Sequence, residues 1–484
     1  MATSVEEDDE ELSLEDLERI FQMRTSCSIE MAQHLVFPPH YSQWRNHWRT
    51  IAESQNELGI QRNRARARLD LRQMRQRLGA AGWRFHQPAN TDEHVGWDDF
   101  IPADVYRDYG ATHVFIVDRC FFCKSLDILL LKMAKFISTL CELARKWKAT
   151  PTFVYTHLLP RPDQMNTVGK QAAFWVEYLV NELEILEITR NLTLMLGAIV
   201  ARSFERVYPV AGSYQSEPYY NLVDALPVRL NHYYKVEHLP RKFDKIIAKS
   251  ACRIGRTVQR IIEDIGRLVS WQEAEVCFKI PNVEAAHMAF QTNDRHLGNI
   301  PILSSRLKEK KEKVESISRQ EEQQGRRHDS TARREEMCEI IALADGVMDH
   351  LDRVTAALVI NEETIDRHIK ERRKAIWMDA ITKRLTEMGK PVEENLPPIS
   401  AVFSAAIDDV AQHREEPDVA IDRIRTSEIT APFWDGIFAM LTPEVYVSNS
   451  IKFVDEYCGL DGVAEKRIEH YKSAIKDLVN SESD

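Results

Sequence analysis

The sequence predicts an all-α protein. Only 17 glycines and 19 prolines occur in 484 residues, so few residues interrupt regular structure. Leu, Ile, Glu, Lys and Arg, which favour helices, are frequent. Apolar residues recur every three or four positions over long stretches, as they do on the buried face of a helix. These observations predict helical domains around a central bundle of long helices.

The predicted elements follow one another with little irregular structure between them. Residues 1–16 are acidic and are expected to form a disordered tail. A helical pattern covers 17–80, and residues 81–123 mix Gly, Pro, Asn and aromatic residues, as irregular segments do. Long helices are predicted over 124–148, 163–205, 240–276 and 331–358. Shorter helices follow from about Asn361, with breaks expected at Pro391, Pro397, Pro398, Pro417 and Pro443.

The length of the 163–205 pattern predicts a bundle. About 40 helical residues would span roughly 60 Å. Such a helix needs neighbours from the same or another subunit to cover its apolar face. The predicted domains are an acidic tail at 1–16, an N-terminal helical domain at 17–111, a central long-helix bundle at 112–360 and a C-terminal helical domain at 361–484.

Composition excludes several classes of protein. The net charge is −11, so no general nucleic-acid footprint is present. Charges interrupt every apolar run well before about 18 residues, so no membrane span is predicted. The acidic N-terminus is unlike a signal peptide, and the eight cysteines are scattered, as reduced intracellular thiols are. We therefore expect a cytoplasmic protein without nucleic-acid or membrane partners.

Several short motifs occur in a regular order along the chain. Thr156-His157 is followed by Thr167-Val168-Gly169-Lys170 and then by a long helical pattern. The other motifs are Trp44-Arg45-Asn46-His47-Trp48, Gly110-Ala111-Thr112, Arg241-Lys242-Phe243-Asp244 and Asp329-Ser330 with Arg333-Arg334.

This series resembles the adenylosuccinate lyases of the fumarase/aspartase superfamily, over nearly the whole chain. The resemblance implies a homotetramer with active sites at subunit junctions, each built from three chains, and no cofactor or metal. It makes His157 the candidate acid/base group, with His86 as a weaker candidate. It also implies substrate binding by Thr112, Lys170, Arg241, Ser330 and Arg333. Of these, Ser330 and Arg333 would hold the nucleotide phosphate.

The segment of this chain that corresponds to the family's catalytic loop departs most from the family pattern. In the family a serine on this loop removes a proton and a lysine stabilises the charge that develops. Counting back from Asp329-Ser330, the two serine positions are Ala285 and Ala286, and the lysine position is Gln291. Alanine has no proton to transfer and glutamine has no charge. His287, within the same loop, is the remaining candidate base.

These losses lead to two hypotheses. The first is an adenylosuccinate lyase-like protein of purine metabolism that is catalytically impaired or inactive and acts as a binding, scaffold or regulatory subunit. Its partners would be further copies of itself or an active paralogue, with AMP or adenylosuccinate as ligands. The second hypothesis is an active adenylosuccinate lyase, in which a rearranged loop supplies the base for release of fumarate.

The charged segment 308–327 bears on assembly. The family has an apolar helix here, buried at the subunit core, whereas this chain has Lys308-Glu309-Lys310-Lys311-Glu312-Lys313 followed by further charges. Because unpaired charges are rarely buried, we expect the segment to lie outside the bundle core.

Three remaining patterns have a structural and a functional interpretation. Cys120 and Cys123 have metal-ligand spacing but no second pair, so packing is the simpler interpretation. His86, His94 and His113 share one irregular region and form a weaker metal hypothesis. The arginine series from Arg62 to Arg77 could meet an anionic partner, although a solvated helix face explains it equally simply.

Overall fold

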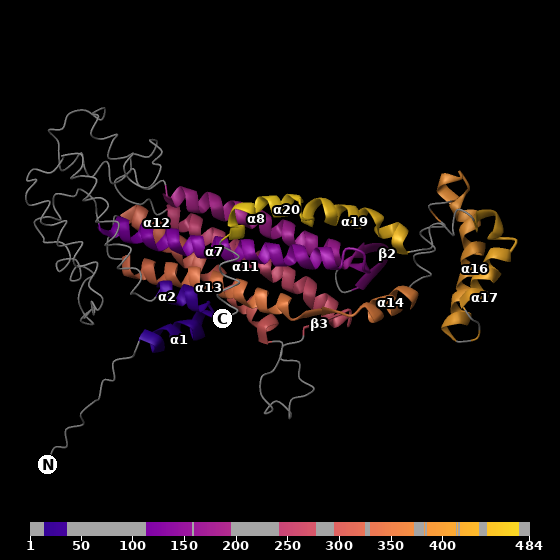
Figure 1. Ribbon diagram of the computed structural model, residues 1–484, viewed down its shortest axis with the longest axis horizontal. Coiled ribbons are helices and arrows are strands. Elements are labelled where there is room, and N and C mark those ends of the chain that lie inside the picture. The colour runs from indigo at the N-terminus through magenta and orange to yellow at the C-terminus, as the bar shows by residue number, and fades with distance from the viewer. Residues whose placement is uncertain are drawn as a thin grey trace, which may run out of the picture. The chain divides into compact units, whose positions relative to one another are not determined.

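The computed structural model describes most of the predicted helices (Figure 1). The residues that it describes are 14–35, 113–156, 159–194, 242–276, 295–324, 330–371, 385–412, 417–434 and 443–473, together with Thr382 and Arg414. These residues form helices and two short two-stranded antiparallel sheets, which confirms the all-α prediction. No helix among them is long and apolar enough to cross a membrane.

Among the described residues, five long helices dominate the fold. They are α7 (His113–Lys146), α8 (Val168–Leu194), α11 (Lys242–Ser270), α12 (Arg295–Gln324) and α13 (Ser330–Ala356). The chain forms two compact units, and the division falls inside each of these helices. Unit 1 holds residues 1–132, 182–256 and 299–350, and unit 2 holds 133–181, 257–298 and 351–484.

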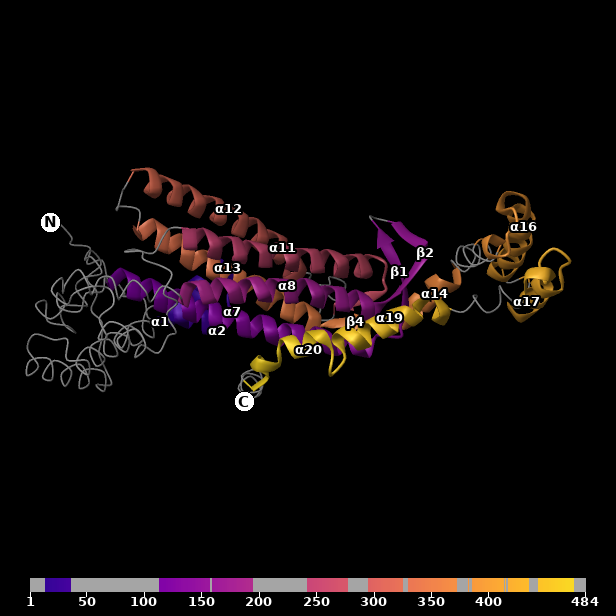
Figure 2. The same cartoon turned by 90° about the horizontal axis from the view of Figure 1, so that it is seen from above.

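Unit 1 is a helix bundle with a short N-terminal helix pair. α1 (Leu14–Thr25) and α2 (Ile29–Leu35) join at Ser26, which has a positive φ of 57°. Within the bundle, Thr189 of α8 hydrogen-bonds to Ser250 of α11 (2.9 Å). Ser304 of α12 donates to the carbonyl of Gly255 on α11 (3.0 Å). Figure 2 shows α12 running beside α11, in agreement with this contact.

The core of unit 1 is centred on α13. Every residue from Ile340 to Met348 is buried, including Asp345 and Gly346. A β-carbon on Gly346 would lie 2.4 Å from the carbonyl oxygen of Thr25, so only glycine lets the α1–α2 connection approach this closely. Arg306 of α12 donates to the carbonyl of Arg24 and tightens the same contact.

Unit 2 contains both two-stranded sheets, of which the first is a hairpin. β1 (Pro151–Thr156) pairs with β2 (Leu159–Thr167), with an irregularity between Phe153 and Val154. β3 (Ala274–Val276) pairs with β4 (Leu358–Ile360). A cluster of buried side chains, Trp147, Phe153, Val168, Ile365 and Ile369, joins the first hairpin to α14 (Glu362–Glu371). The predicted helix over 163–205 therefore begins at Val168, because the residues before it form β2.

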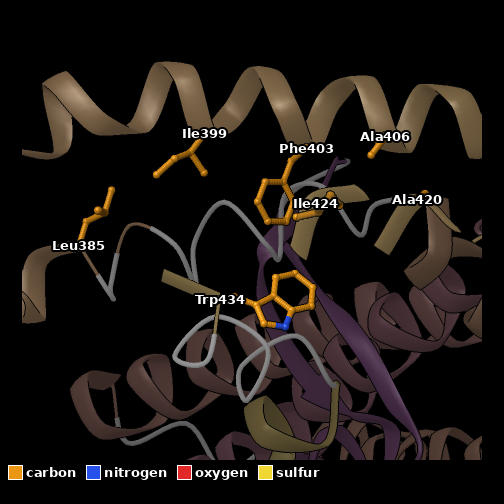
Figure 3. Packing of buried hydrophobic residues seen from close by; sticks show 7 residues of the cluster. All are labelled: Leu385, Ile399, Phe403, Ala406, Ala420, Ile424 and Trp434. Carbon is orange, nitrogen blue, oxygen red and sulfur yellow. The ribbon is translucent and has the colours of Figure 1, made fainter. Parts of the chain in front are cut away.

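A smaller apolar core lies in the C-terminal part of unit 2 (Figure 3). It consists of Leu385, Ile399, Phe403, Ala406, Ala420, Ile424 and Trp434. These residues come mainly from α16 (Val392–Ala411) and α17 (Pro417–Thr426), and the ring of Trp434 faces the ring of Phe403.

The prolines of this region do not all act as breaks. Pro417 and Pro443 are the first residues of α17 and of α19 (Pro443–Cys458), where a missing N–H costs nothing. The break predicted at Pro397 and Pro398 is wrong, since both lie inside α16. The packing of Ile399 and Phe403, buried just after them, offsets the lost backbone hydrogen bonds.

The described charged residues of α12 are exposed or half-buried, which agrees with the expectation that the charged segment lies outside the bundle core. Leu307, Val314 and Ser318 are buried, so one face of the helix is packed. Two of its lysines pair with α13: Lys310 lies 3.0 Å from Glu336 and 2.6 Å from Glu339, and Lys313 also contacts Glu336. The segment packs because α13 supplies carboxylates opposite the cations of α12.

Candidate functional site

Two of the sequence motifs meet in unit 1, at the beginnings of α11 and α13. Arg333 is buried, and its Nε and Nη2 donate to the two carboxylate oxygens of Asp244 at 2.6 and 2.7 Å. The guanidinium also lies over the ring of Phe122, 5.7 Å from its centre. Arg333 belongs to the Asp-Ser-x-x-Arg-Arg motif and Asp244 to the Arg-Lys-Phe-Asp motif, so one ion pair joins the two.

Helix electrostatics explain this pairing. Asp244 lies in the first turn of α11, where the positive end of the helix dipole favours a carboxylate. Arg333 lies in the first turn of α13, where the same field disfavours a cation. A bidentate carboxylate therefore compensates both the dipole and the burial of the guanidinium. Two of the five N–H donors of Arg333 are already used by this contact, which leaves its phosphate-binding role a prediction.

The neighbouring Arg334 belongs to the same motif but was not among the predicted substrate-binding residues. It is half-buried, one position further along the same motif. Burial lowers the pKa of its guanidinium, while the Cys338 thiol one turn later acts in the opposite sense. Ser330 is the first residue of α13, and its side chain is outside the described part. Arg334 therefore joins Ser330 and Arg333 as a candidate phosphate ligand.

The Thr-Val-Gly-Lys motif forms the start of α8 in unit 2. The hydroxyl of Thr167 accepts the backbone N–H of Lys170 (3.0 Å) and so caps the helix. A β-carbon on Gly169 would lie 2.4 Å from the carbonyl oxygen of Ala144 and 2.5 Å from the Cα of Lys148. Close packing against the end of α7 therefore requires glycine here.

Lys170 itself contacts aromatic rings. Its ammonium lies 5.9 Å from the ring centres of both Phe174 and Phe453, within the range of a cation–π interaction. Phe453 belongs to α19 and stacks on Tyr457 of the same helix. Lys170 thus helps to attach α19 to α8, and its role in substrate binding remains a prediction. Lys170 belongs to unit 2 and Arg333 to unit 1.

Two further buried carboxylates organise polar contacts. In unit 1, Asp345 is fully buried, lies 2.5 Å from Lys132 and accepts the backbone N–H of Ser28 (2.7 Å). Desolvation, with Asp345 also contributing, raises the pKa of the adjacent Cys27 thiol to about 11, so this cysteine is unreactive. Asp345 therefore anchors the N-terminal helix pair on the bundle.

In unit 2, Glu273 organises the second of these clusters. Thr152 of β1 donates to it at 3.0 Å, and Nδ1 of His368 on α14 lies 2.8 Å from its other oxygen. The carboxylate connects β1, the end of α11 and α14. Sequence reasoning missed Glu273 and Asp345 because their partners are distant in the chain.

The remaining predicted site residues lie outside the described part of the chain. They are His86, Thr112, His157, Arg241, Ala285, Ala286 and Gln291. The arginine series 62–77, His94 and Cys120's side chain are outside it as well. Within the described residues, no group of three His, Cys, Asp or Glu side chains is arranged to hold a metal ion. Phe121 and Phe122, between the two cysteines of the Cys-x-x-Cys pattern, are buried core residues.

Comparison with solved structures defines the fold. The 3-carboxy-cis,cis-muconate lactonizing enzyme of Pseudomonas putida superposes with a TM-score of 0.67 at 13% identity, covering 93% of this chain and 99% of that one. A fumarate lyase from Mesorhizobium sp. BNC1 gives 0.61 at 14% identity, covering 90% and 99%. An EDDS lyase variant with bound fumarate gives 0.58 at 14%, covering 97% and 96%. The chain therefore has the fold of the fumarate lyases.

Curated relatives narrow this assignment. Adenylosuccinate lyase of Saccharomyces cerevisiae is 22% identical over 453 residues, covering 90% of this chain and 92% of the yeast enzyme. That of Schizosaccharomyces pombe is 21% identical over 494 residues, covering 93% and 95%. No family model matches the chain. Nearly full-length similarity and a shared fold make the chain a divergent member of the fumarase/aspartase superfamily, related to the adenylosuccinate lyases.

Proposed function

We propose that this chain is an adenylosuccinate lyase-like protein with impaired β-elimination, which acts as a binding, scaffold or regulatory subunit. The observation that carries the proposal is the replacement at the catalytic loop, where Ala285, Ala286 and Gln291 stand at the serine and lysine positions of the family pattern. Fumarate release needs a base and a cation for the carboxylate that gains charge. These three residues supply neither.

The retained motifs support the proposal indirectly. Arg333 is engaged by Asp244, and Gly169 by close packing on Ala144 and Lys148. Both would be kept by a chain that must fold as its relatives do, whether or not it turns over substrate. The presence of these motif residues therefore gives little support to the hypothesis that the chain is an active enzyme.

The test is fumarate release from adenylosuccinate by the purified protein, with the Saccharomyces cerevisiae enzyme assayed in parallel. Loss of one electrostatic donor typically costs about 10²–10³ in rate, so we expect turnover at least roughly a thousandfold lower. The variant Ala285→Ser/Ala286→Ser/Gln291→Lys should show a measurable gain. An ordinary rate that His157→Ala abolishes would contradict the proposal.

The same assay tests the alternative, an active adenylosuccinate lyase with a rearranged loop. Similarity to the yeast enzyme over 90% of this chain favours it. In that case His287 is the nearest candidate base, and His287→Ala should remove an activity that is present in the wild type.

Nucleotide binding is proposed separately, at the start of α13. AMP would place its phosphate near Ser330 and one of the motif arginines. Calorimetric titration of AMP should give heat with the wild type and much less with Arg334→Ala, which leaves the Arg333–Asp244 pair intact. Absence of heat with the wild type would mean that the phosphate site is vestigial.

We also propose a homo-oligomer, a tetramer by resemblance, or a mixed assembly with an active paralogue, in the cytoplasm. The family resemblance implies an apolar helix buried at the subunit core at this position, whereas the exposed side of α12 carries mixed charges. The packing of subunits around α12 would therefore differ from that of the family. Light scattering after size exclusion decides this, and a monomer at micromolar concentration would contradict it.

A further inference from the structure

One face of α11 in unit 1 carries a row of cations. They recur every three or four residues and so lie on one side of the helix. The five residues are Lys242, Lys245, Lys249, Arg253 and Arg256. The opposite side holds Ile247, Ala248, Ala251 and Ile254, all buried, so packing fixes which side the cations occupy. We refer to these five residues as the basic face of α11.

The basic face is largely accessible. The side chain of Lys249 is 61% exposed and that of Arg253 is 42% exposed, and Lys242 and Arg256 are also exposed. Among the described residues, Glu182 of α8 pairs with Arg253 (2.9 Å), Glu315 of α12 lies 3.9 Å from Lys249, and Lys245 has a further contact of its own. Asp244 of the same helix is buried and paired with Arg333. Five cations within 15 residues therefore leave the face basic even with these contacts.

This concentration of positive charge is a local exception in a chain with a net charge of −11. From Lys242 to Arg256 the helix rises by about 21 Å. Regularly spaced cations along a straight, convex helix surface fit a linear polyanion, whose charges follow one another at short intervals. The chain itself contains such a segment.

We propose that the basic face of α11 docks the acidic segment Glu6–Glu11 of this chain. That segment has six consecutive carboxylates, and no lysine or arginine occurs before Arg19. Six extended residues span about 20 Å, which matches the length of the basic face. The segment ends close to Leu14, where α1 begins, and α1 belongs to the same unit as this half of α11.

The contact has a defined consequence. Each exposed ion pair contributes little, so the docked state depends on several pairs together and weakens as salt is added. While docked, the segment excludes other polyanions from the basic face. The inference is independent of the proposed lyase-like function, because neither element contains a residue of the candidate catalytic loop.

Zero-length carbodiimide cross-linking of the full chain, read by mass spectrometry, tests the proposal. Bonds should form between carboxylates of Glu6–Glu11 and the amines of Lys242, Lys245 and Lys249. Their yield should fall severalfold at about 0.5 M salt and in Arg256→Glu, which leaves all three lysines in place. The control is Arg425→Glu, an exposed arginine on α17, which should change nothing.

Two outcomes would overturn the proposal. One is cross-linking of the acidic segment spread evenly over exposed lysines such as Lys308, Lys390 and Lys452, or none at all. The other is tight binding of a labelled single-stranded oligonucleotide by the wild type, unchanged when Glu6–Glu11 are neutralised. Mixing isotopically light and heavy protein shows whether a bond joins one chain or two copies; bonds within one chain support the proposal, and bonds only between two copies would contradict it.

Discussion

The two retained motif regions are held in different ways. In unit 1, Arg333 and Asp244 form a buried ion pair beside the ring of Phe122, so a charge of one motif neutralises a charge of another. In unit 2, Thr167 and Gly169 begin α8 by a cap and by close backbone contact, without any buried charge. In both regions the motif residues make contacts that stabilise the fold. A motif that survives in a divergent chain therefore shows conserved architecture before it shows conserved chemistry.

The largest loss of unfolding free energy is expected in unit 1, when the buried ion pair is broken. Asp244→Ala leaves a buried guanidinium without its carboxylate, and loss of one partner of a buried pair costs about 3–5 kcal/mol of unfolding free energy. The double variant Asp244→Leu/Arg333→Met removes both charges and should recover most of that loss. Urea unfolding followed by circular dichroism measures both.

A matched control for this experiment is Arg253→Ala. Its pair with Glu182 is partly exposed, so the expected loss stays below about 1 kcal/mol. Equal losses in Asp244→Ala and in the double variant would show that the two side chains matter for packing and not as an ion pair.

The next effect concerns the start of α8. Gly169→Ala places a methyl group against backbone atoms of Ala144 and Lys148, which cannot move aside like a flexible side chain. Overpacking of this kind typically costs about 1–3 kcal/mol. Gly266→Ala is the control, because nothing lies within 4 Å of its added methyl, and it should stabilise α11 by about 0.4–1 kcal/mol. A neutral Gly169→Ala would mean that the helix start adapts.

Sequence periodicity predicted the long helices well because an amphipathic pattern depends on neighbours along the chain. The same reasoning missed β1 and β2, since Pro160 and Pro162 within a mixed polar segment give no alternating pattern. It also misplaced the break at Pro397 and Pro398, where tertiary packing outweighs two lost hydrogen bonds.

The site was less predictable than the fold. The motif letters identified Arg333 and Asp244 separately, but their contact joins residues 89 positions apart, and no local pattern reports it. Glu273 and Asp345 lie in no sequence motif. Each connects three parts of the chain that meet only in the folded protein. Ala285, Ala286 and Gln291, which carry the functional proposal, lie outside the described residues and rest on sequence alone.

A smaller loss of unfolding free energy is expected for the partly buried ion pairs between α12 and α13. Glu339 is partly buried; burial alone would raise the pKa of its carboxyl, but Lys310 and Arg306 together lower it. Lys310→Met should cost less than about 1 kcal/mol, because such pairs are screened by water. The cost should shrink between 50 mM and 1 M salt, whereas that of Asp244→Ala should not. Lys308→Met, an exposed change on the same helix, is the control.

The smallest expected effect is local and depends on pH. His34 of α2 is buried, and its Nε2 contacts the carbonyl of Phe121 (3.3 Å) and the hydroxyl of Ser125 (3.1 Å). Burial lowers the pKa of His34 below its usual value of 6.5. A buried base of this kind favours the folded state while it is neutral. Its contribution is therefore complete above pH 6.5 and declines as the pH falls below that value.

We expect this decline to loosen the N-terminal helix pair before the rest of unit 1. Hydrogen exchange corrected for its intrinsic pH dependence should show protection of α2 falling between pH 7.5 and 5.5, while protection of α13 holds. His34→Gln keeps a side-chain donor at this position but cannot titrate, so its α2 protection should stay constant over the same range. An equal decline in both proteins would assign the effect to a group other than His34.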